Sequence, residues 1–135
     1  MTLFGQEHVR RYRETDGEEG FVWREGSHIL LLTTTGRKTG NRTTTPLIFG
    51  KDGENPVIVA SQGGAPDHPG WYKNLVEHPD AEVQIKGETF AVRARDAEGD
   101  ERERLWRMMN REWRHYDEYQ QKTDRVIPVV VLERT

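Results

Sequence analysis

Two apolar, β-branched segments, separated by a short turn with a glycine on each side, limit the folds that are open to this chain. Residues 28–35 (HILLLTTT) and 43–49 (TTTPLIF) both have the composition of strands, and the first of them reads as buried. Residues 36–42 (GRKTGNR) connect them. Because so short a connection cannot cross over a sheet, the two strands must be antiparallel. A doubly wound fold is therefore disfavoured.

Four more strands are predicted at 56–61, 81–86, 88–95 and 126–132. The run at 56–61 is continuously apolar, which predicts cover on both faces. The GKDG sequence at 50–53 is predicted to be a hairpin turn, since Asp-Gly supplies the positive φ angles that such turns need. The first three strands follow one another through short turns, so we expect them to be antiparallel. About six such strands in a small domain commonly close into a barrel, which removes exposed edges.

Helices alternate with strands too rarely for β-α-β units. The pattern predicts helices at 4–15, 67–78 and 98–113, and a shorter turn or helix around 116–119. Asp67 is the expected cap of the second helix, with Pro69 in its first turn. The 135 residues are expected to form a single domain, residues 1–135, whose first 20 residues are flexible or cap a groove.

Composition excludes several classes of protein. The formal charge of −3 argues against a general nucleic-acid binder, which needs a basic surface. The chain has no cysteine, so disulfides, thiol catalysis and thiolate metal sites are excluded. No apolar run approaches the roughly 20 residues of a membrane span, and the N-terminus lacks the apolar core of a signal peptide. A cytoplasmic location is the default. The five histidines show no metal-binding pattern, so we expect no metal.

The turn at 36–42 is the first candidate site. Arg37, Lys38 and Arg42 concentrate positive charge in a chain that is otherwise nearly neutral. Backbone N–H groups in a glycine-framed turn can face an anion, and the cationic side chains add charge-assisted hydrogen bonds. The spacing matches neither a Walker loop nor a Rossmann fingerprint. A solvated hairpin tip is the alternative interpretation.

The second candidate is the SQGGAP loop at 61–66 and the helix after it. Glycines let the backbone approach a ligand closely, and N–H groups at a helix N-terminus favour an anion or a carbonyl. Trp71 and Asn74 are three residues apart and would share a helix face. The alternative is a core helix anchored by Trp71 and preceded by a flexible loop.

The third candidate is the aromatic series Trp113, Tyr116 and Tyr119, each three residues after the last. On one helix they would form an aromatic face that stacks on a planar ring, and a phenol could donate a proton or a hydrogen bond. Such a stripe is also typical of a protein core.

Taken together, these segments resemble one family, the actinobacterial split-barrel deazaflavin-dependent quinone and nitro reductases. The matching stretches are LLTTTGRKTG at 31–40, PLIF at 46–49, VIVASQGG at 57–64, WYKNL at 71–75, VQI at 83–85 and TDRVIPVV at 123–130. The resemblance implies an α+β, mainly β fold, a split β-barrel of about six mostly antiparallel strands with three to four flanking helices. It also implies 8-hydroxy-5-deazaflavin (coenzyme F-420) as cofactor, whose tail carries phosphate and oligoglutamate.

The resemblance also implies roles for individual residues. The basic turn would hold the phosphate region, and a second group of residues would line or approach the deazaflavin ring. The first group is Arg37, Lys38, Thr39 and Arg42; the second is Pro46, Ala60, Ser61, Gln62, Gly63, Gly64, Trp71 and Asn74. The implied catalytic residues are Tyr116, Ser61 and Tyr119, with the two tyrosines at the acceptor site.

The implied reaction is hydride transfer from the reduced deazaflavin to a quinone or nitroaromatic acceptor. Ser61, backbone N–H groups at Gly63 and Gly64, and Tyr116 could stabilise the developing negative charge, and the final proton would come from Tyr116 or water. The alternatives are a non-catalytic deazaflavin carrier and a split-barrel protein that binds FMN or haem. The expected partner is a small-molecule acceptor, with no nucleic acid and at most peripheral membrane contact.

Overall fold

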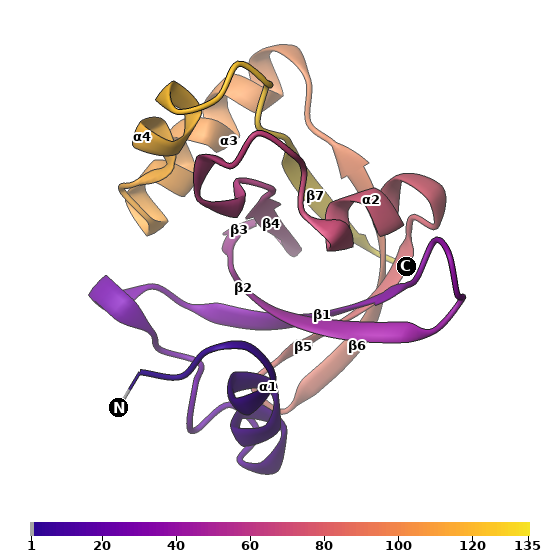
Figure 1. Cartoon of the computed structure of the whole chain (residues 1–135). Helices are drawn as coiled ribbons and strands as arrows, with labels where there is room; N and C mark the ends of the chain where they lie inside the picture. Colours follow the sequence, from indigo (N-terminus) through magenta and orange to yellow (C-terminus); the bar gives the residue numbers. More distant parts are fainter. Residues whose placement is uncertain (1) are drawn as a thin grey trace.

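The computed structural model describes residues 2–135 and is built around a curled β-sheet (Figure 1). Within these residues the sheet has seven strands in the order β2-β1-β5-β6-β7-β4-β3, and all neighbours are antiparallel. The strands are β1 (Ile29–Thr35), β2 (Arg42–Ile48), β3 (Gly50–Asp52), β4 (Asn55–Val59), β5 (Asp80–Ile85), β6 (Glu88–Asp96) and β7 (Val129–Arg134).

The two ends of this strand order meet at Phe49. β2 and β3 lie at opposite ends of the order, yet only Phe49 separates them in the chain. Its N–H donates to the carbonyl of His28 over 3.1 Å, and the chain then turns away to pair β3 with β4. The sheet therefore curls back on itself into an incompletely closed barrel (Figure 1). The prediction of a mainly β split barrel with antiparallel strands is confirmed.

Two details of the predicted sheet are wrong. Residues 50–52 form strand β3, and the turn lies at Gly53 and Glu54, so the strand count is seven among the described residues. Consequently the strand predicted at 43–49 does not pair with the one predicted at 56–61; β4 pairs with β3 and β7. Composition cannot locate the bend at Phe49, because a strand of three residues and a turn of three residues can have the same amino-acid composition.

The last strand begins at Val129 instead of Val126. The residues before it are engaged elsewhere. The N–H of Ile127 donates to the Gln120 side chain over 2.9 Å, and the carbonyl of Pro128 accepts from Ala60 over 2.9 Å. This apolar run therefore starts as a connection and becomes a strand only after Pro128, which has no N–H to contribute.

Four α-helices and two short 3-10 turns surround the sheet in the described chain. The helices are α1 (Gly5–Glu14), α2 (Gly70–Glu77), α3 (Gly99–Glu112) and α4 (Tyr116–Gln121), and the turns are Arg24–Gly26 and Gln62–Gly64.

The prediction that Asp67 caps the second helix is wrong. Pro69 is the residue before α2, with an extended ψ of 151°, so the helix cannot begin earlier. The Asp67 carboxylate instead accepts from Lys73 Nζ over 2.6 Å.

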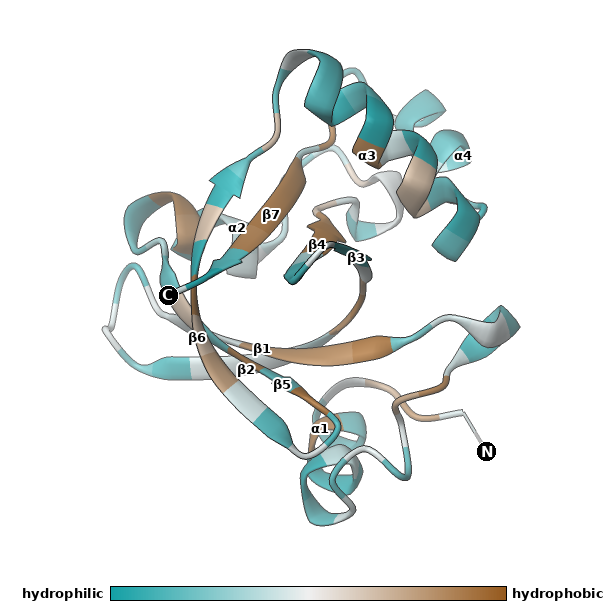
Figure 2. Ribbon diagram, turned by 180° about the vertical axis from the view of Figure 1, so that it is seen from behind, coloured by the Kyte–Doolittle hydropathy of each residue, from teal (hydrophilic) through white to brown (hydrophobic). Residues whose placement is uncertain are grey.

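The apolar strands are covered on both faces (Figure 2). In β1, Leu30 and Leu32 belong to the core inside the barrel, while Ile29 and Leu31 pack under α1. In β4 the same alternation divides the side chains between the barrel core and a second cluster beneath α3 and α4. Double cover explains why these strands read as continuous apolar runs. No helix among residues 2–135 is long and apolar enough to cross a membrane.

Helix α1 is fastened to the barrel by a buried tyrosine. Tyr12 is fully buried; its hydroxyl donates to the carbonyl of Ile29 over 2.9 Å and accepts from the N–H of Lys86 over 2.8 Å. Burial raises the pKa of this phenol, so it stays protonated at neutral pH. The helix places the N-terminal segment beside β2 and the cavity described next.

Candidate functional site

A cavity of about 660 Å³ lies where the barrel meets its surrounding helices. It is lined by the N-terminal segment, by Trp23 and Arg24, by residues of β1, β2 and β4, by the loop after β4 with the start of α2, and by the α3–α4 region. Its lining includes Phe4, His8, Trp23, Arg24, Pro46, Leu47, Ser61, Gln62, Gly63, Gly70, Trp71, Trp113, Tyr116 and Tyr119. The walls are mostly apolar and aromatic with few polar groups, which is typical of a site for a planar organic ligand.

The loop after β4 has an unusual backbone. Gln62, Gly63 and Gly64 all have positive φ, at 45°, 64° and 83°. At Gly64 a Cβ atom would lie 2.6 Å from the backbone oxygen of Tyr119, so only glycine fits between the loop and α4. At Gly63 nothing lies within 4 Å of the same position, and this residue lines the cavity. The loop thus packs on α4 at Gly64 and presents open backbone to the cavity at Gly63.

Arg125 holds this loop in place. Its guanidinium donates to the carbonyls of Ala60 (3.1 Å), Ser61 (2.7 Å) and Ala65 (2.9 Å). It also donates to Nδ1 of His68 over 3.0 Å, and burial together with Arg125 lowers the pKa of that imidazole. Sequence reasoning missed Arg125 as a site residue. The only sequence signal is a cation directly before an apolar strand, which does not reveal a partner about 60 residues away in the chain.

The basic turn lies next to α2 (Figure 1), and the first residues of that helix line the cavity. Oδ1 of Asn74 accepts from the N–H of Arg37 (3.1 Å) and from its guanidinium (2.9 Å), while Nδ2 donates to Thr34 (3.1 Å). The same guanidinium reaches the carbonyl of Gly70 over 3.3 Å, and Gly70 lines the cavity. Asn74 therefore fastens the turn to α2 and does not itself line the cavity.

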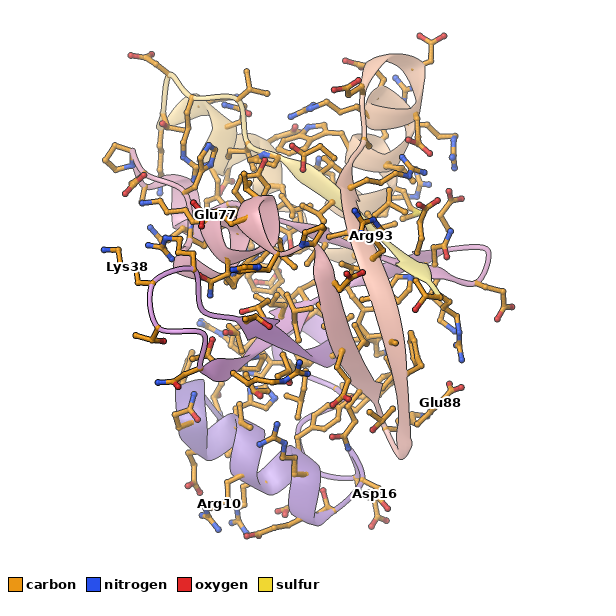
Figure 3. The ribbon with its side chains drawn as sticks, turned by 90° about the vertical axis from the view of Figure 1, so that its right-hand side faces the viewer. Arg10, Asp16, Lys38, Glu77, Glu88 and Arg93 are labelled. Carbon is orange, nitrogen blue, oxygen red and sulfur yellow. The ribbon has the colours of Figure 1, made fainter. Side chains whose placement is uncertain are left out.

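The remaining charges of the turn are free. Lys38, Thr39 and Arg42 are exposed, and Lys38 projects into solvent (Figure 3). Within residues 2–135 no salt bridge involves Arg37, Lys38 or Arg42. Most other surface arginines among these residues are paired with carboxylates, so this turn differs from them in carrying unpaired positive charge.

The aromatic series converges on the cavity by a route that its spacing did not predict. Trp113 follows α3 with an extended backbone, whereas Tyr116 begins α4, so the three residues do not share one helix face. All three nevertheless line the cavity, and Nε1 of Trp113 donates to the hydroxyl of Tyr119 over 3.2 Å. Burial, followed by Tyr119 and Glu112, raises the pKa of Tyr116 well above its usual range. Its hydroxyl is therefore a hydrogen-bond donor at every physiological pH.

The sequence-predicted residues fall into two groups. Those that line the cavity are Pro46, Ser61, Gln62, Gly63, Trp71, Tyr116 and Tyr119. Those that do not line it are Arg37, Lys38, Thr39, Arg42, Ala60, Gly64 and Asn74. Ala60 is fully buried in the barrel core. Trp23, His8 and Phe4 line the cavity but were not predicted, because an N-terminal segment gives no sequence signal of what it covers. The described residues contain no cluster of side chains suited to a metal ion.

A family model for F420H2-dependent quinone reductases matches residues 4–134. This chain belongs to that family. It is 42% identical over 130 residues to an F420H2-dependent quinone reductase of Mycobacterium tuberculosis, a match that covers 94% of this chain and 87% of the relative.

Solved structures agree with the family assignment. The structure of an F420-H2 dependent reductase is 42% identical with a TM-score of 0.73, covering 78% of this chain and 93% of its own. A second structure, described as a domain-swapped dimer, is 39% identical with a TM-score of 0.76 and covers 95% of this chain and 96% of its own. A haem storage protein of Vibrio cholerae is only 16% identical at a TM-score of 0.63 and shares the fold alone.

Proposed function

We propose that this member of the F420H2-dependent quinone reductase family transfers a hydride from reduced 8-hydroxy-5-deazaflavin to a quinone held in the same cavity. One observation carries the assignment of the site: the guanidinium of Arg37 contacts the carbonyl of Gly70, which lines the cavity. The aromatic-lined cavity thus lies beside a turn that carries three cations, none of which is paired with a carboxylate among residues 2–135. That combination fits a molecule with a planar ring and an acidic tail.

The residues present fit this cofactor. The loop at Gly63 is open backbone where a Cβ would meet nothing, so a ring can approach it closely. Trp71, Pro46 and Ser61 line the cavity beside that loop. Arg37 and Lys38 would meet the phosphate, with Thr39 and Arg42 nearby for the acidic tail. When bound, the reduced deazaflavin supplies a hydride; the protein supplies position, charge and exclusion of water.

The acceptor would bind in the part of the cavity that is lined by Trp23, Trp113 and the tyrosines of α4. Trp23 and Trp113, whose ring centroids are 5.8 Å apart, offer flat apolar surface there, and Tyr116 and Tyr119 add hydroxyl groups. A quinone oxygen becomes negatively charged as it is reduced. The hydroxyl of Tyr116 and the Ser61–Gly63 loop would donate hydrogen bonds to it, which lowers the barrier to transfer. Nitroaromatic compounds present the same flat ring and polar oxygens, and we propose them as a second acceptor class.

Two measurements test this proposal. Fluorescence titration compares the affinity of the chain for coenzyme F-420 with that for FMN, and tighter binding of FMN would overturn the cofactor assignment. The reduced cofactor is then mixed with menadione and a nitroaromatic compound, and the return of the oxidised cofactor's visible absorbance is followed. Tight binding of F420 without oxidation of its reduced form by any acceptor would identify a carrier protein instead of a reductase.

A further inference from the structure

Glu25 has a backbone that its residue type does not favour. It lies in the Arg24–Gly26 turn with φ of 56° and ψ of 27°, in the left-handed region that side chains other than glycine and asparagine seldom adopt. The N–H of Trp23 donates to the carbonyl of Ser27 over 2.8 Å, which closes this turn tightly. A strained conformation of this kind persists only where contacts around the residue hold it in place.

The Glu25 carboxylate bridges to the segment between α3 and α4. Oε1 accepts from Nε of Arg114 over 2.7 Å, and Oε2 pairs with Nε2 of His115 over 2.8 Å. Nδ1 of His115 in turn faces Glu118 at 3.3 Å. We call Glu25, Arg114 and His115 the Glu25 clasp. Among residues 2–135 it is the ion-pair link between the N-terminal part of the chain and the α3–α4 segment.

Both segments joined by the clasp line the acceptor end of the cavity. Trp23 stands immediately before the turn that carries Glu25, and Trp113 immediately before the two clasp residues of the α3–α4 segment. Their rings are 5.8 Å apart, and the His115 ring packs edge-on against Trp113 at 4.8 Å. In Figure 1 the Arg24–Gly26 turn lies below the connection between α3 and α4, at the open side of the barrel.

We propose that the Glu25 clasp holds Trp23 against Trp113 and thereby forms the surface on which the quinone ring rests. Glu25 is a positioning residue, since it acts through the two tryptophans and does not itself line the cavity. This inference rests on the proposed function, because it takes the quinone to bind at this end. The strained turn and the bridging carboxylate together fix the orientation of the Trp23 ring relative to Trp113.

The clasp is sensitive to pH through His115. The charged groups that face its ring are Glu25, Glu118 and Arg114. Glu25, then Glu118, raises the pKa of His115, and Arg114 followed by His115 lowers the pKa of Glu25. The His115 contribution is therefore complete below the ordinary histidine pKa of about 6.5 and is lost as pH rises through the raised value. Arg114 keeps its half of the clasp throughout, so the KM for the quinone should rise modestly over that interval.

The test replaces Glu25 with glutamine, which keeps its shape and removes its charge. Exposed ion pairs are individually weak, so we expect Glu25→Gln to raise the KM for menadione about threefold to tenfold and to remove its pH dependence. The affinity for coenzyme F-420 should not change. The matched control is Asp80→Asn, which breaks the exposed pair with Arg93 on the far strands and should leave KM as it is. An unchanged KM in Glu25→Gln overturns the proposal.

A second variant separates positioning from folding. Glu25→Gly also deletes the clasp, but it relieves the strained backbone, so the protein should be at least as stable while the KM still rises. Hydrogen exchange at residues 23–27 and 113–119 supplies a readout that needs no turnover: both segments should exchange faster in either variant. If exchange is faster in the variants but the wild-type protein oxidises no reduced cofactor, the proposed function is overturned and the clasp is kept. If exchange is unchanged in the variants, the clasp alone is overturned.

Discussion

Two glycine-containing segments flank the proposed cofactor, and they are built on opposite principles. The loop at 60–65 has its shape imposed from outside: Arg125 donates to three of its carbonyls, and Gly64 packs against Tyr119. The turn at 36–42 is fastened to α2 through Arg37, which binds Asn74 and Gly70, and it leaves Lys38 and Arg42 exposed to solvent. We therefore expect the first segment to contribute shape to the proposed site and the second to contribute charge. Damage to the first should therefore appear in stability, and damage to the second in ligand affinity and its dependence on salt.

The sharpest test of the shape-giving loop is Gly64→Ala. The new methyl group would meet the Tyr119 carbonyl at 2.6 Å, on a backbone with φ of 83°. We expect a loss of about 2–4 kcal/mol in the free energy of unfolding, measured by chemical denaturation. Gly63→Ala is the matched control: φ is 64° but nothing lies within 4 Å, so only backbone strain of about 1 kcal/mol remains. Equal losses in both variants would show that the packing on α4 is unimportant.

Arg125 should be the next most costly residue to change. Arg125→Met removes the donors to three carbonyls and to His68, so we expect a loss of about 1–3 kcal/mol in the free energy of unfolding together with weaker cofactor binding. Arg125→Lys is the informative companion. It keeps the charge but cannot serve three carbonyls at once, so it should behave much like methionine. If lysine restores both properties, charge and not the guanidinium fork organises the loop.

The contrast between the two segments explains what could be predicted from the sequence. A concentration of cations in a glycine-framed turn is visible in the sequence itself, so Arg37 and Lys38 could be singled out from the sequence. Arg125 could not be recognised, because its function is defined by backbone carbonyls far away in the chain, and carbonyls carry no sequence signal. Glu25 was missed for a similar reason: neither its strained φ nor its partners Arg114 and His115 follow from local composition.

The sheet shows the same limit. Strands with strong apolar patterns were predicted within a few residues, because burial on both faces leaves a local trace. The position of β3 depends on where Phe49 bends the chain, which is decided by tertiary packing. The predicted shared helix face of Trp113, Tyr116 and Tyr119 is wrong, because a break between α3 and α4 separates Trp113 from the two tyrosines. All three nevertheless line the same cavity.

The charge-giving turn should respond differently from the loop. Arg37→Ala and Lys38→Ala are each expected to weaken binding of coenzyme F-420 by about 1–3 kcal/mol, the usual worth of a hydrogen bond to a charged group, with little effect on unfolding for Lys38→Ala. Because Lys38 is exposed and Arg37 is only half-buried, the effect should be larger at low salt. Titrations at two ionic strengths measure this. Arg107→Ala, an exposed cation on α3, is the control that should show no change.

Arg37 and Lys38 also differ from each other in a testable way. Arg37 is bound to Asn74 and Gly70, whereas Lys38 extends outward into solvent (Figure 3). Asn74→Ala should therefore weaken cofactor binding in the same direction as Arg37→Ala by releasing the turn from α2. Normal affinity in both Arg37→Ala and Lys38→Ala would show that the turn is only a solvated hairpin tip.

Tyr116 is nearly fully buried and also lines the cavity, so it can contribute both shape and a polar group to the proposed site. Its replacement should have the smallest effect of the changes considered. The raised pKa of its phenol means that it keeps its proton across the working range, and under the proposed function it would donate a hydrogen bond to the reduced acceptor. Tyr116→Phe should lower turnover about fivefold, the equivalent of one neutral hydrogen bond of about 1 kcal/mol, with unchanged cofactor affinity. The wild-type rate should show no loss between about pH 7 and 9 that can be assigned to this group.

Tyr119→Phe serves as a comparison, since it removes the hydroxyl that accepts from Trp113. If Tyr116→Phe turns over as fast as wild type, water supplies both the hydrogen bond and the final proton, and the buried tyrosine contributes only shape.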